Sequence, residues 1–148
     1  SDKASSDVHT LKPGGFANAA SQDEFCRGTE CTVVRLFDQS PRGNHLDPAP
    51  PGGAARHWDK GVNATKERLM VGSVPAYGAF FEGGMGYRIL NASGVATGDE
   101  PESMYMVTSG RHFNGGCCFD YGNAETDAID HGAGTMEALY FGSSQGWG

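Results

Sequence analysis

The sequence lacks several patterns that would place it in a common functional class. No apolar stretch approaches the ~18 residues that a membrane-spanning helix needs. Basic residues are few, with 11 Lys and Arg against 18 Asp and Glu, so the net charge is −7 and no basic run occurs. Nucleic acid and anionic lipid attract proteins with a positive surface. We therefore expect neither a nucleic-acid partner nor a membrane partner.

Motifs for metals and nucleotides are also missing. No Cys-x-x-Cys or close His pair gives the ligand spacing of a zinc site. The acidic run at residues 125–130 lacks the spacing of a calcium loop, and we interpret it as a solvated loop. The glycines form neither G-x-G-x-x-G nor a P-loop between a strand and a helix. The sequence therefore predicts no metal site and no cofactor.

What is present indicates a turn-rich β protein. Glycine reaches 23 residues and aromatics 10%, and short apolar segments alternate with Gly, Pro, Asn and Asp. Ser21 and Glu24 fit a capping box, which predicts a short helical turn before Cys26. Strands are predicted at residues 31–37, 76–81, 86–89, 103–108, 119–121 and 135–141. We expect an all-β sandwich with no internal domain boundary.

The most informative feature is the adjacent pair Cys117 and Cys118. A bridge between neighbours closes almost no loop, and Cα atoms ~3.8 Å apart are closer than the ~4.4–6.8 Å that disulfides prefer. Such a strained bridge would suggest a function, such as a rigid apolar surface for a ligand. The alternatives are two thiols or bonds to separate partners. Cys26 and Cys31 flank a short turn and could close a small loop, but four cysteines allow three connectivities.

Two N-glycosylation sequons occur, at Asn63 and at Asn91. Each triplet alone is weak evidence for glycosylation, because such triplets often arise by chance. Together with the paired cysteines they favour an oxidising environment, so we expect a secreted, extracellular glycoprotein.

Several longer segments resemble one enzyme family. The run FDQSPRGNHL at residues 37–46 is similar to a signature of concanavalin-like β-sandwiches. The segments APPGG (49–53), ATGDE (96–100), CCFDYGNAET (117–126) and GAGTMEA (132–138) resemble the catalytic domain of glycoside hydrolase family 54. Members of that family are secreted, retaining α-L-arabinofuranosidases. The resemblance runs from about Leu11 to Gly148, and its most specific part is the CCFDYGN run.

The resemblance implies a jelly-roll β-sandwich that binds terminal arabinofuranose in a small pocket. It maps a vicinal disulfide that packs against the sugar onto Cys117 and Cys118, and it pairs Cys26 with Cys31. It also maps an aromatic residue bordering the pocket onto Trp147, which lies between glycines. A lone Trp is otherwise usually a core residue, but an exposed ring can stack on a sugar.

The family's nucleophilic Glu and its acid/base Asp have no matching positions, because both follow the position of Gly148. Asp120 and Glu137 would be candidates from the residues alone, but the resemblance places the pair elsewhere and leaves them as a turn residue and a solvent-facing residue. A further N-terminal stretch of the family domain is also unmatched. We therefore expect residues 1–148 to be part of one incomplete sandwich domain that needs a further polypeptide segment.

These points predict part of an enzyme that releases arabinofuranose from arabinan or arabinoxylan. The chain would supply part of the sugar pocket and no catalytic carboxylate, and would be inactive alone. The alternatives are a non-catalytic carbohydrate-binding module and a structural or fibre subunit completed by strands from neighbours.

Overall fold

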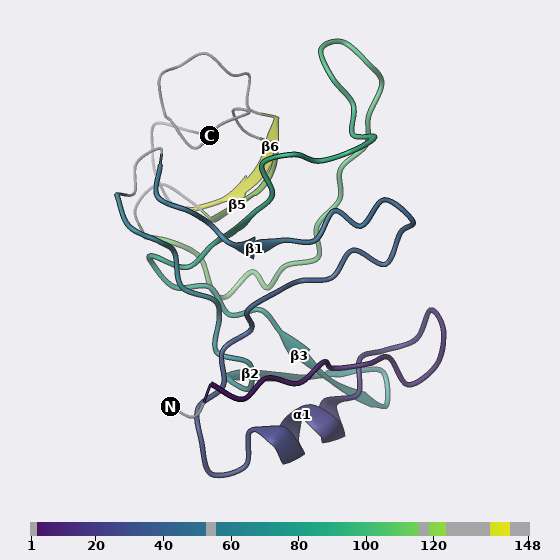
Figure 1. The fold of residues 1–148 in the computed structure, drawn as a ribbon, viewed down its shortest axis with the longest axis vertical. Helices are drawn as coiled ribbons and strands as arrows, with labels where there is room; N and C mark the ends of the chain where they lie inside the picture. The colour runs from purple at the N-terminus through teal and green to yellow at the C-terminus, as the bar shows by residue number, and fades with distance from the viewer. Residues whose placement is uncertain (1–2, 53–55, 116–118, 124–136, 143–148) are drawn as a thin grey trace. The chain divides into compact units, whose positions relative to one another are not determined.

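The computed structural model describes residues 3–52, 56–115, 119–123 and 137–142. Within them the regular elements are mostly strands, with one short helix, which confirms a β protein (Figure 1). The elements are α1 (Ala19–Phe25), β1 (Asp47–Pro48), β2 (Glu67–Val71), β3 (Val74–Gly78), β4 (Tyr87–Arg88), β5 (Phe119–Gly122) and β6 (Ala138–Phe141). None of the helical residues in these ranges forms a segment able to cross a membrane.

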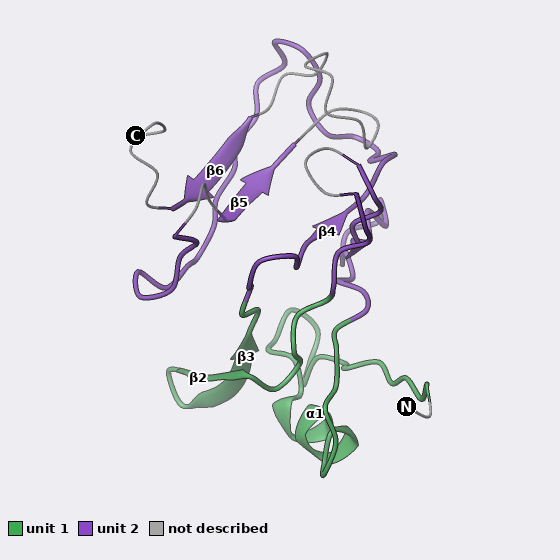
Figure 2. Cartoon of the chain, turned by 90° about the vertical axis from the view of Figure 1, so that its left-hand side faces the viewer, with its two compact units in different colours: residues 1–33, 61–80 green, residues 34–60, 81–148 purple. Residues whose placement is uncertain are grey.

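The chain divides into two compact units (Figure 2). Unit 1 comprises residues 1–33 and 61–80, and unit 2 comprises residues 34–60 and 81–148. Strands pair as three antiparallel two-stranded sheets, β2 with β3 in unit 1, and β1 with β4 and β5 with β6 in unit 2. The assignment of all 148 residues to one sandwich domain stays a prediction.

The helix of unit 1 begins earlier than the capping-box motif predicts. Asn18 is the N-cap, and its side-chain oxygen accepts a hydrogen bond from the backbone N–H of Ser21 at 3.2 Å. Ser21 is already inside the helix, and its hydroxyl donates to the Asn18 carbonyl at 2.9 Å. The predicted turn before Cys26 is therefore confirmed, but the cap at Ser21 is wrong, because Asn18 caps the helix by accepting from the Ser21 N–H.

A hairpin of β2 and β3 faces this helix in unit 1. Its register pairs Glu67 with Gly78 and Val71 with Val74, so the turn consists of Gly72 and Ser73. Gly72 has a φ of +63°, which a glycine adopts without the Cβ penalty of other residues. β3 was predicted at residues 76–81, but it ends at Gly78, and β2 was not predicted.

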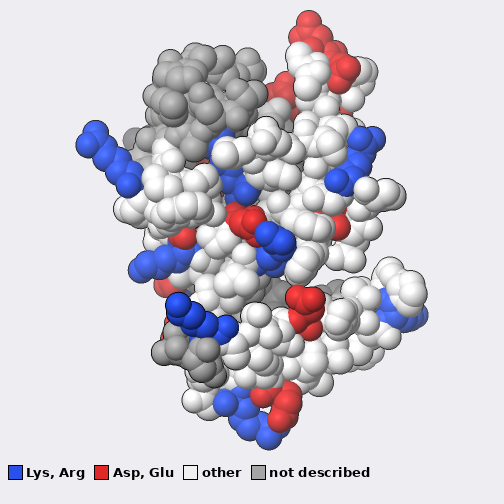
Figure 3. Space-filling model, viewed as in Figure 1, with Lys and Arg blue, Asp and Glu red and all other residues white. Residues whose placement is uncertain are grey.

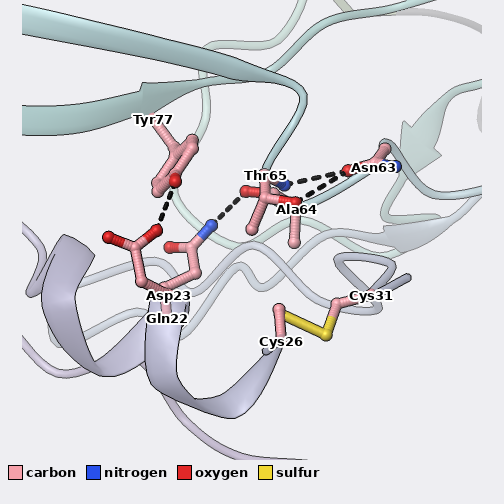
Figure 4. Close-up of a disulfide and its surroundings, with 8 residues drawn as sticks. All are labelled: Gln22, Asp23, Cys26, Cys31, Asn63, Ala64, Thr65 and Tyr77. Carbon is pink, nitrogen blue, oxygen red and sulfur yellow. Dashed lines mark hydrogen bonds between the residues drawn. A yellow bond between two sulfur atoms is a disulfide. The ribbon is translucent and has the colours of Figure 1, made fainter. Parts of the chain in front are cut away.

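Four small apolar side chains form the buried core of unit 1. They are Ala19, Cys26, Val62 and Ala64, the buried apolar side chains of the described part of the chain. Cys26 bonds to Cys31 with their Cα atoms 5.7 Å apart, a normal disulfide separation (Figure 4). Just beyond the disulfide, Thr32 forms a β-bridge with Asn63, so this segment joins the helix end to residues 62–64.

Unit 2 contains two short sheets and several isolated bridges. Asp47 pairs with Arg88 in the sheet of β1 and β4. Leu36 pairs with Leu46 in an isolated bridge that closes the loop at residues 37–45. Aromatic rings connect β5 and β6 to neighbouring segments, with Phe81 lying 6.3 Å from Phe119 between ring centroids. Among the described residues of this unit, no large apolar side chain is fully buried.

The prediction of one strand over residues 31–37 is wrong, and a strand at residues 103–108 is not present in the described structure. Residues 31–37 form no continuous strand, because Thr32 pairs with Asn63 in unit 1 and Leu36 pairs with Leu46 in unit 2. Residues 103–108 form no strand among the described residues. Propensity indicates which segments can pair, but a strand also needs a neighbour with free backbone groups along its length.

Candidate functional site

The three predicted sugar-binding residues, Cys117, Cys118 and Trp147, lie outside the described residues. The hairpin of β5 and β6 next to them is described. β5 begins at Phe119, directly after Cys118, and β6 ends at Phe141, six residues before Trp147. The hairpin therefore contains the described strand residues that are nearest in sequence to the predicted site residues.

The register of the hairpin places Phe119, the start of β5, and Phe141, the end of β6, at the same end. Phe119 pairs with Phe141, whereas Gly122 pairs with Ala138 at the opposite end. A parallel bridge between Asn114 and Gly142 fixes the segment before the cysteines beside the segment after β6.

Aromatic packing holds the same end of the hairpin. The ring of Phe119 lies 5.4 Å from that of His112, and the ring of Phe113 meets that of Phe141 edge-on at 6.1 Å. A ring nitrogen of His112 also forms a short hydrogen bond with the carbonyl oxygen of Phe81. The half-buried His112 therefore links Phe81 to β5.

The strand register shows that Asp120 and Glu137 do not form a glycosidase pair. Asp120 pairs with Tyr140, whereas Glu137 accepts a backbone hydrogen bond from Asn123. The two carboxylates are thus three positions apart, about 10 Å along the strands, and on opposite faces. A retaining pair requires carboxylates ~5–5.5 Å apart. Both side chains are exposed, which agrees with the interpretation of Glu137 as a solvent-facing residue. Asp120, however, lies in a strand instead of a turn.

The far end of the hairpin holds a polar group that the sequence analysis missed. The side chain of Asn123 donates to the Glu137 carboxylate at 3.0 Å and accepts from its backbone N–H at 2.7 Å. Glu102 shares a hydrogen bond with Glu137, and this bond raises the pKa of Glu102 above its ordinary value. No motif links residues 102 and 137, so only the fold reveals that these carboxyl groups meet.

The loop at residues 37–46 is organised by one carboxylate. Asp38 accepts hydrogen bonds from the Ser40 hydroxyl and backbone N–H, both at 2.7 Å, and from the Asn44 N–H at 2.8 Å. These donors lower the pKa of Asp38, the Ser40 hydroxyl most strongly. The backbone N–H of Asp38 donates to Nδ1 of His45 at 3.0 Å. This signature therefore has a structural role in forming a turn.

The two sequons differ in local structure. Asn63 is half-buried, and its side-chain oxygen accepts a hydrogen bond from the N–H of Thr65 at 2.9 Å. Asn91 is exposed, and Ser93 of its sequon donates its backbone N–H to Asn44 at 2.9 Å. Glycan occupancy at either position stays a prediction.

A second polar cluster that the sequence analysis missed lies in unit 1. Asp23 of α1 accepts hydrogen bonds from Arg68 at 2.5 Å and from the hydroxyl of Tyr77 (Figure 4 shows the tyrosine contact). These bonds lower the pKa of Asp23, that from Tyr77 most strongly. The cluster ties the helix to both strands of the hairpin, and its members are too far apart in sequence for any motif to predict.

The described residues form no cluster of metal ligands, and the face drawn in Figure 3 shows no basic patch. No group of three or more His, Cys, Asp or Glu side chains within the described ranges could hold an ion. On the face drawn in Figure 3, Lys and Arg occur in small groups among acidic and uncharged side chains.

Comparison with known proteins assigns the chain to a family. The model of "Alpha-L-arabinofuranosidase B, catalytic" matches residues 1–148. Probable alpha-L-arabinofuranosidase B of Aspergillus terreus is 52% identical, and alpha-L-arabinofuranosidase B of Aspergillus niger is 47% identical. Each match covers 100% of this chain, and the chain spans 30% of each relative's length.

Solved structures agree with the sequence comparison. A crystal structure of an arabinofuranosidase complexed with arabinofuranosyl-alpha-1,2-xylobiose is 46% identical, with a TM-score of 0.91. A family 54 α-L-arabinofuranosidase soaked with a cyclic sulfate inhibitor gives a TM-score of 0.92 at the same identity. Both matches cover 100% of this chain and 32% of the solved chain. With its full length matched by the family model and by these structures, the chain belongs to glycoside hydrolase family 54, the alpha-L-arabinofuranosidase B family.

Proposed function

We propose that this chain supplies part of the arabinofuranose pocket of a secreted, retaining α-L-arabinofuranosidase. The observation that carries the proposal is the match of all 148 residues, at 46% identity and a TM-score of 0.91, to an arabinofuranosidase solved with an arabinofuranosyl-xylobiose. The substrate would be a polysaccharide with terminal arabinofuranose, such as arabinan or arabinoxylan.

The pocket would lie at the Phe119–Phe141 end of the hairpin of β5 and β6. A vicinal disulfide of Cys117 and Cys118 would provide a stiff apolar surface for one face of the sugar, and Trp147 would border the pocket. Two features of the hairpin support this placement. Its register brings Phe119, which follows Cys118 in sequence, and Phe141, which precedes Trp147 by six residues, to one end, and packed aromatic rings fix that end. These residues would position the sugar and would not break the glycosidic bond.

The bond-breaking carboxylates would come from polypeptide outside residues 1–148. A retaining mechanism needs one carboxylate to form a covalent glycosyl-enzyme and a second to act as acid and then base. The described acidic residues of the hairpin do not meet that spacing, since Asp120 and Glu137 lie on opposite faces. The whole domain would then be a jelly-roll sandwich completed by a further segment.

Hydrolysis of an aryl α-L-arabinofuranoside tests this proposal. A polypeptide of the relatives' length that contains this chain should release the aryl alcohol, whereas residues 1–148 alone should not. Proton NMR of the first sugar product should show the α-anomer, as retention requires. Turnover by the 148 residues alone would contradict the assignment of the carboxylates. Sugar binding without turnover by the longer polypeptide would indicate a non-catalytic carbohydrate-binding module instead.

A tryptophan pair provides the matched control. Trp147→Ala in the longer polypeptide should lower kcat/KM roughly tenfold or more, because a ring that stacks on the sugar contributes about a kcal/mol or more of binding. Trp58→Ala should leave kcat/KM unchanged, since Trp58 is 64% exposed in a polar loop. Equal effects of the two substitutions would remove the argument for Trp147.

A further inference from the structure

Residues 103–108, Ser-Met-Tyr-Met-Val-Thr, combine a strand-forming sequence with an uncovered surface. Tyr105 is 86% exposed and Val107 is 96% exposed, the two highest values among the large apolar residues of the described chain. Met104 is half-buried and Met106 is 37% exposed. Exposure therefore alternates with a period of two, which is the pattern of a strand with one face covered and one face open.

The backbone of this segment has no partner within the described ranges. Residues 103–108 are neither helix, strand nor turn, and no described residue makes a backbone hydrogen bond with them. None of the six is a proline, so each carries both a donor and an acceptor. Aromatic and β-branched residues favour strands, and a row of free N–H and C=O groups can pair with an added strand.

We propose that residues 103–108 are a sheet strand whose partner is a segment of the same polypeptide outside residues 1–148. That segment pairs with the free backbone groups and covers the Tyr105 and Val107 face. The inference rests on the proposed function, in which further polypeptide completes the domain, and it names the surface that this polypeptide occupies.

The relatives favour this occupant over a second copy of the chain. The same fold, at a TM-score of 0.91–0.92, occurs in solved chains of which it makes up only 32%. The additional polypeptide of those proteins is therefore joined to this fold covalently. A tethered segment acts at an effective concentration of about millimolar, which a second molecule at micromolar concentration does not match.

Photo-crosslinking from Tyr105 identifies the occupant. In a polypeptide of the relatives' length, Tyr105→p-benzoylphenylalanine places a photoreactive group on the open face of the segment. After irradiation and digestion, mass spectrometry should find a crosslink within one molecule to a peptide outside residues 1–148. Val95→p-benzoylphenylalanine is the control, because Val95 is 51% exposed in a loop without the alternating pattern and should give no dominant product.

Three outcomes would overturn the inference. A crosslink to another peptide of residues 1–148 would show that this chain covers its own segment. A crosslinked dimer would identify a second copy as the partner, and the absence of any dominant product would show that the face is open to water. Amide exchange provides a second readout, since paired N–H groups of residues 103–108 should exchange ~100-fold or more slowly than free ones.

Activity measured on the same sample separates this inference from the proposed function. An active polypeptide without the expected crosslink would refute the strand partner and leave the function standing. An inactive polypeptide with the crosslink would refute the function and leave the strand partner standing.

Discussion

At the scale of single residues, Asp38 shows how one carboxylate can organise a loop. Its side chain accepts three hydrogen bonds from Ser40 and Asn44, and its own backbone N–H donates to His45. This run resembles a signature of concanavalin-like β-sandwiches, and the structure gives a physical reason for its residues. The signature consists of donors and an acceptor that close one turn.

Asp38→Asn should lower the melting temperature by a few degrees at pH 7, because an amide offers an N–H₂ group where donors now point. The hydrogen bonds hold the pKa of Asp38 below its unfolded value of ~3.9. The stability from this carboxylate is therefore present above that value and is lost as pH falls through the lower folded pKa. Calorimetry from pH 7 to pH 2 should show the difference between variant and wild type shrinking at the acidic end.

The control for this substitution is Asp99→Asn. Asp99 is exposed and makes no hydrogen bond in the described structure, so its replacement should leave the melting temperature unchanged at every pH. An equal effect of the two substitutions would contradict a special role for Asp38.

Glu102→Gln should stabilise the protein at pH 7, in contrast to the destabilising Asp38→Asn. The shared hydrogen bond with Glu137 raises the pKa of Glu102, which means that the folded state holds its proton more tightly than the unfolded state does. The stability from this pair is thus present at acidic pH and is lost as pH rises through the raised folded pKa. The melting temperature should rise at pH 7 and not at pH 4.

Glu30→Gln is the matched control for Glu102→Gln. Glu30 is exposed and forms no described hydrogen bond or ion pair, so the charge changes equally without a carboxylate neighbour. A similar gain at pH 7 for Glu30→Gln would assign the effect to net charge instead of to the pair.

At the scale of elements, helix α1 shows how a motif can fit and still be displaced. Ser21 and Glu24 have the spacing of a capping box, yet Asn18 three residues earlier takes the cap. Asn is as good a cap as Ser, and the earlier start adds a turn whose Ala19 is buried. Burial of the apolar side chain explains why the longer helix forms.

Asn18→Ala should destabilise the chain by about 1 kcal/mol, because it removes the cap of the Ser21 N–H. Asn18→Asp should retain most of the stability, since aspartate accepts the same hydrogen bond. Urea unfolding followed by circular dichroism measures both. If Asn18→Ala unfolds at the same urea concentration as wild type, the helix does not begin where the structure places it.

The hairpin of β2 and β3 depends on its turn glycine. Gly72→Ala should cost about 1 kcal/mol, because its φ of +63° places a Cβ in the left-handed region, although no atom blocks the added methyl group. Gly83→Ala is the control, since Gly83 has open space around it and no positive φ. Urea unfolding should show the loss for Gly72 alone, and equal losses would contradict the turn assignment.

At the scale of the whole molecule, the described chain exposes many apolar side chains. They include Val34, Leu69, Met70, Tyr105 and Val107, while the fully buried apolar residues are few and small. Folded domains usually bury most of their large apolar side chains in a core, which the described residues do not do. We propose that most of it is covered by the further polypeptide of the family domain.

The 148 residues alone should therefore bind a hydrophobic dye such as 8-anilinonaphthalene-1-sulfonate much more strongly than a polypeptide of the relatives' length. Fluorescence titration of equal molar concentrations measures the difference. Equal fluorescence of the two proteins would show that the surface stays open in the longer one, and the covering argument would fail.

Part of the fold could be predicted from the sequence, and the limits are physical, whereas the site residues Cys117, Cys118 and Trp147 stay a prediction. The run after Cys118 predicted β5 and the family, and Cys26 and Cys31 were recognised as able to close a small loop. Local propensity could not decide that residues 31–37 divide their pairing between Asn63 and Leu46. That outcome depends on which backbone groups are free in distant segments.

The sequence by itself determined the family, the acidic charge and the β-rich class, because these follow from residue identity and from patterns within a few positions. Only the tertiary structure decided that Asp120 and Glu137 lie on opposite faces, that Glu102 meets Glu137, and that Phe119 and Phe141 share one end of a hairpin. Each of these depends on register, which is fixed by hydrogen bonds between segments far apart in the chain.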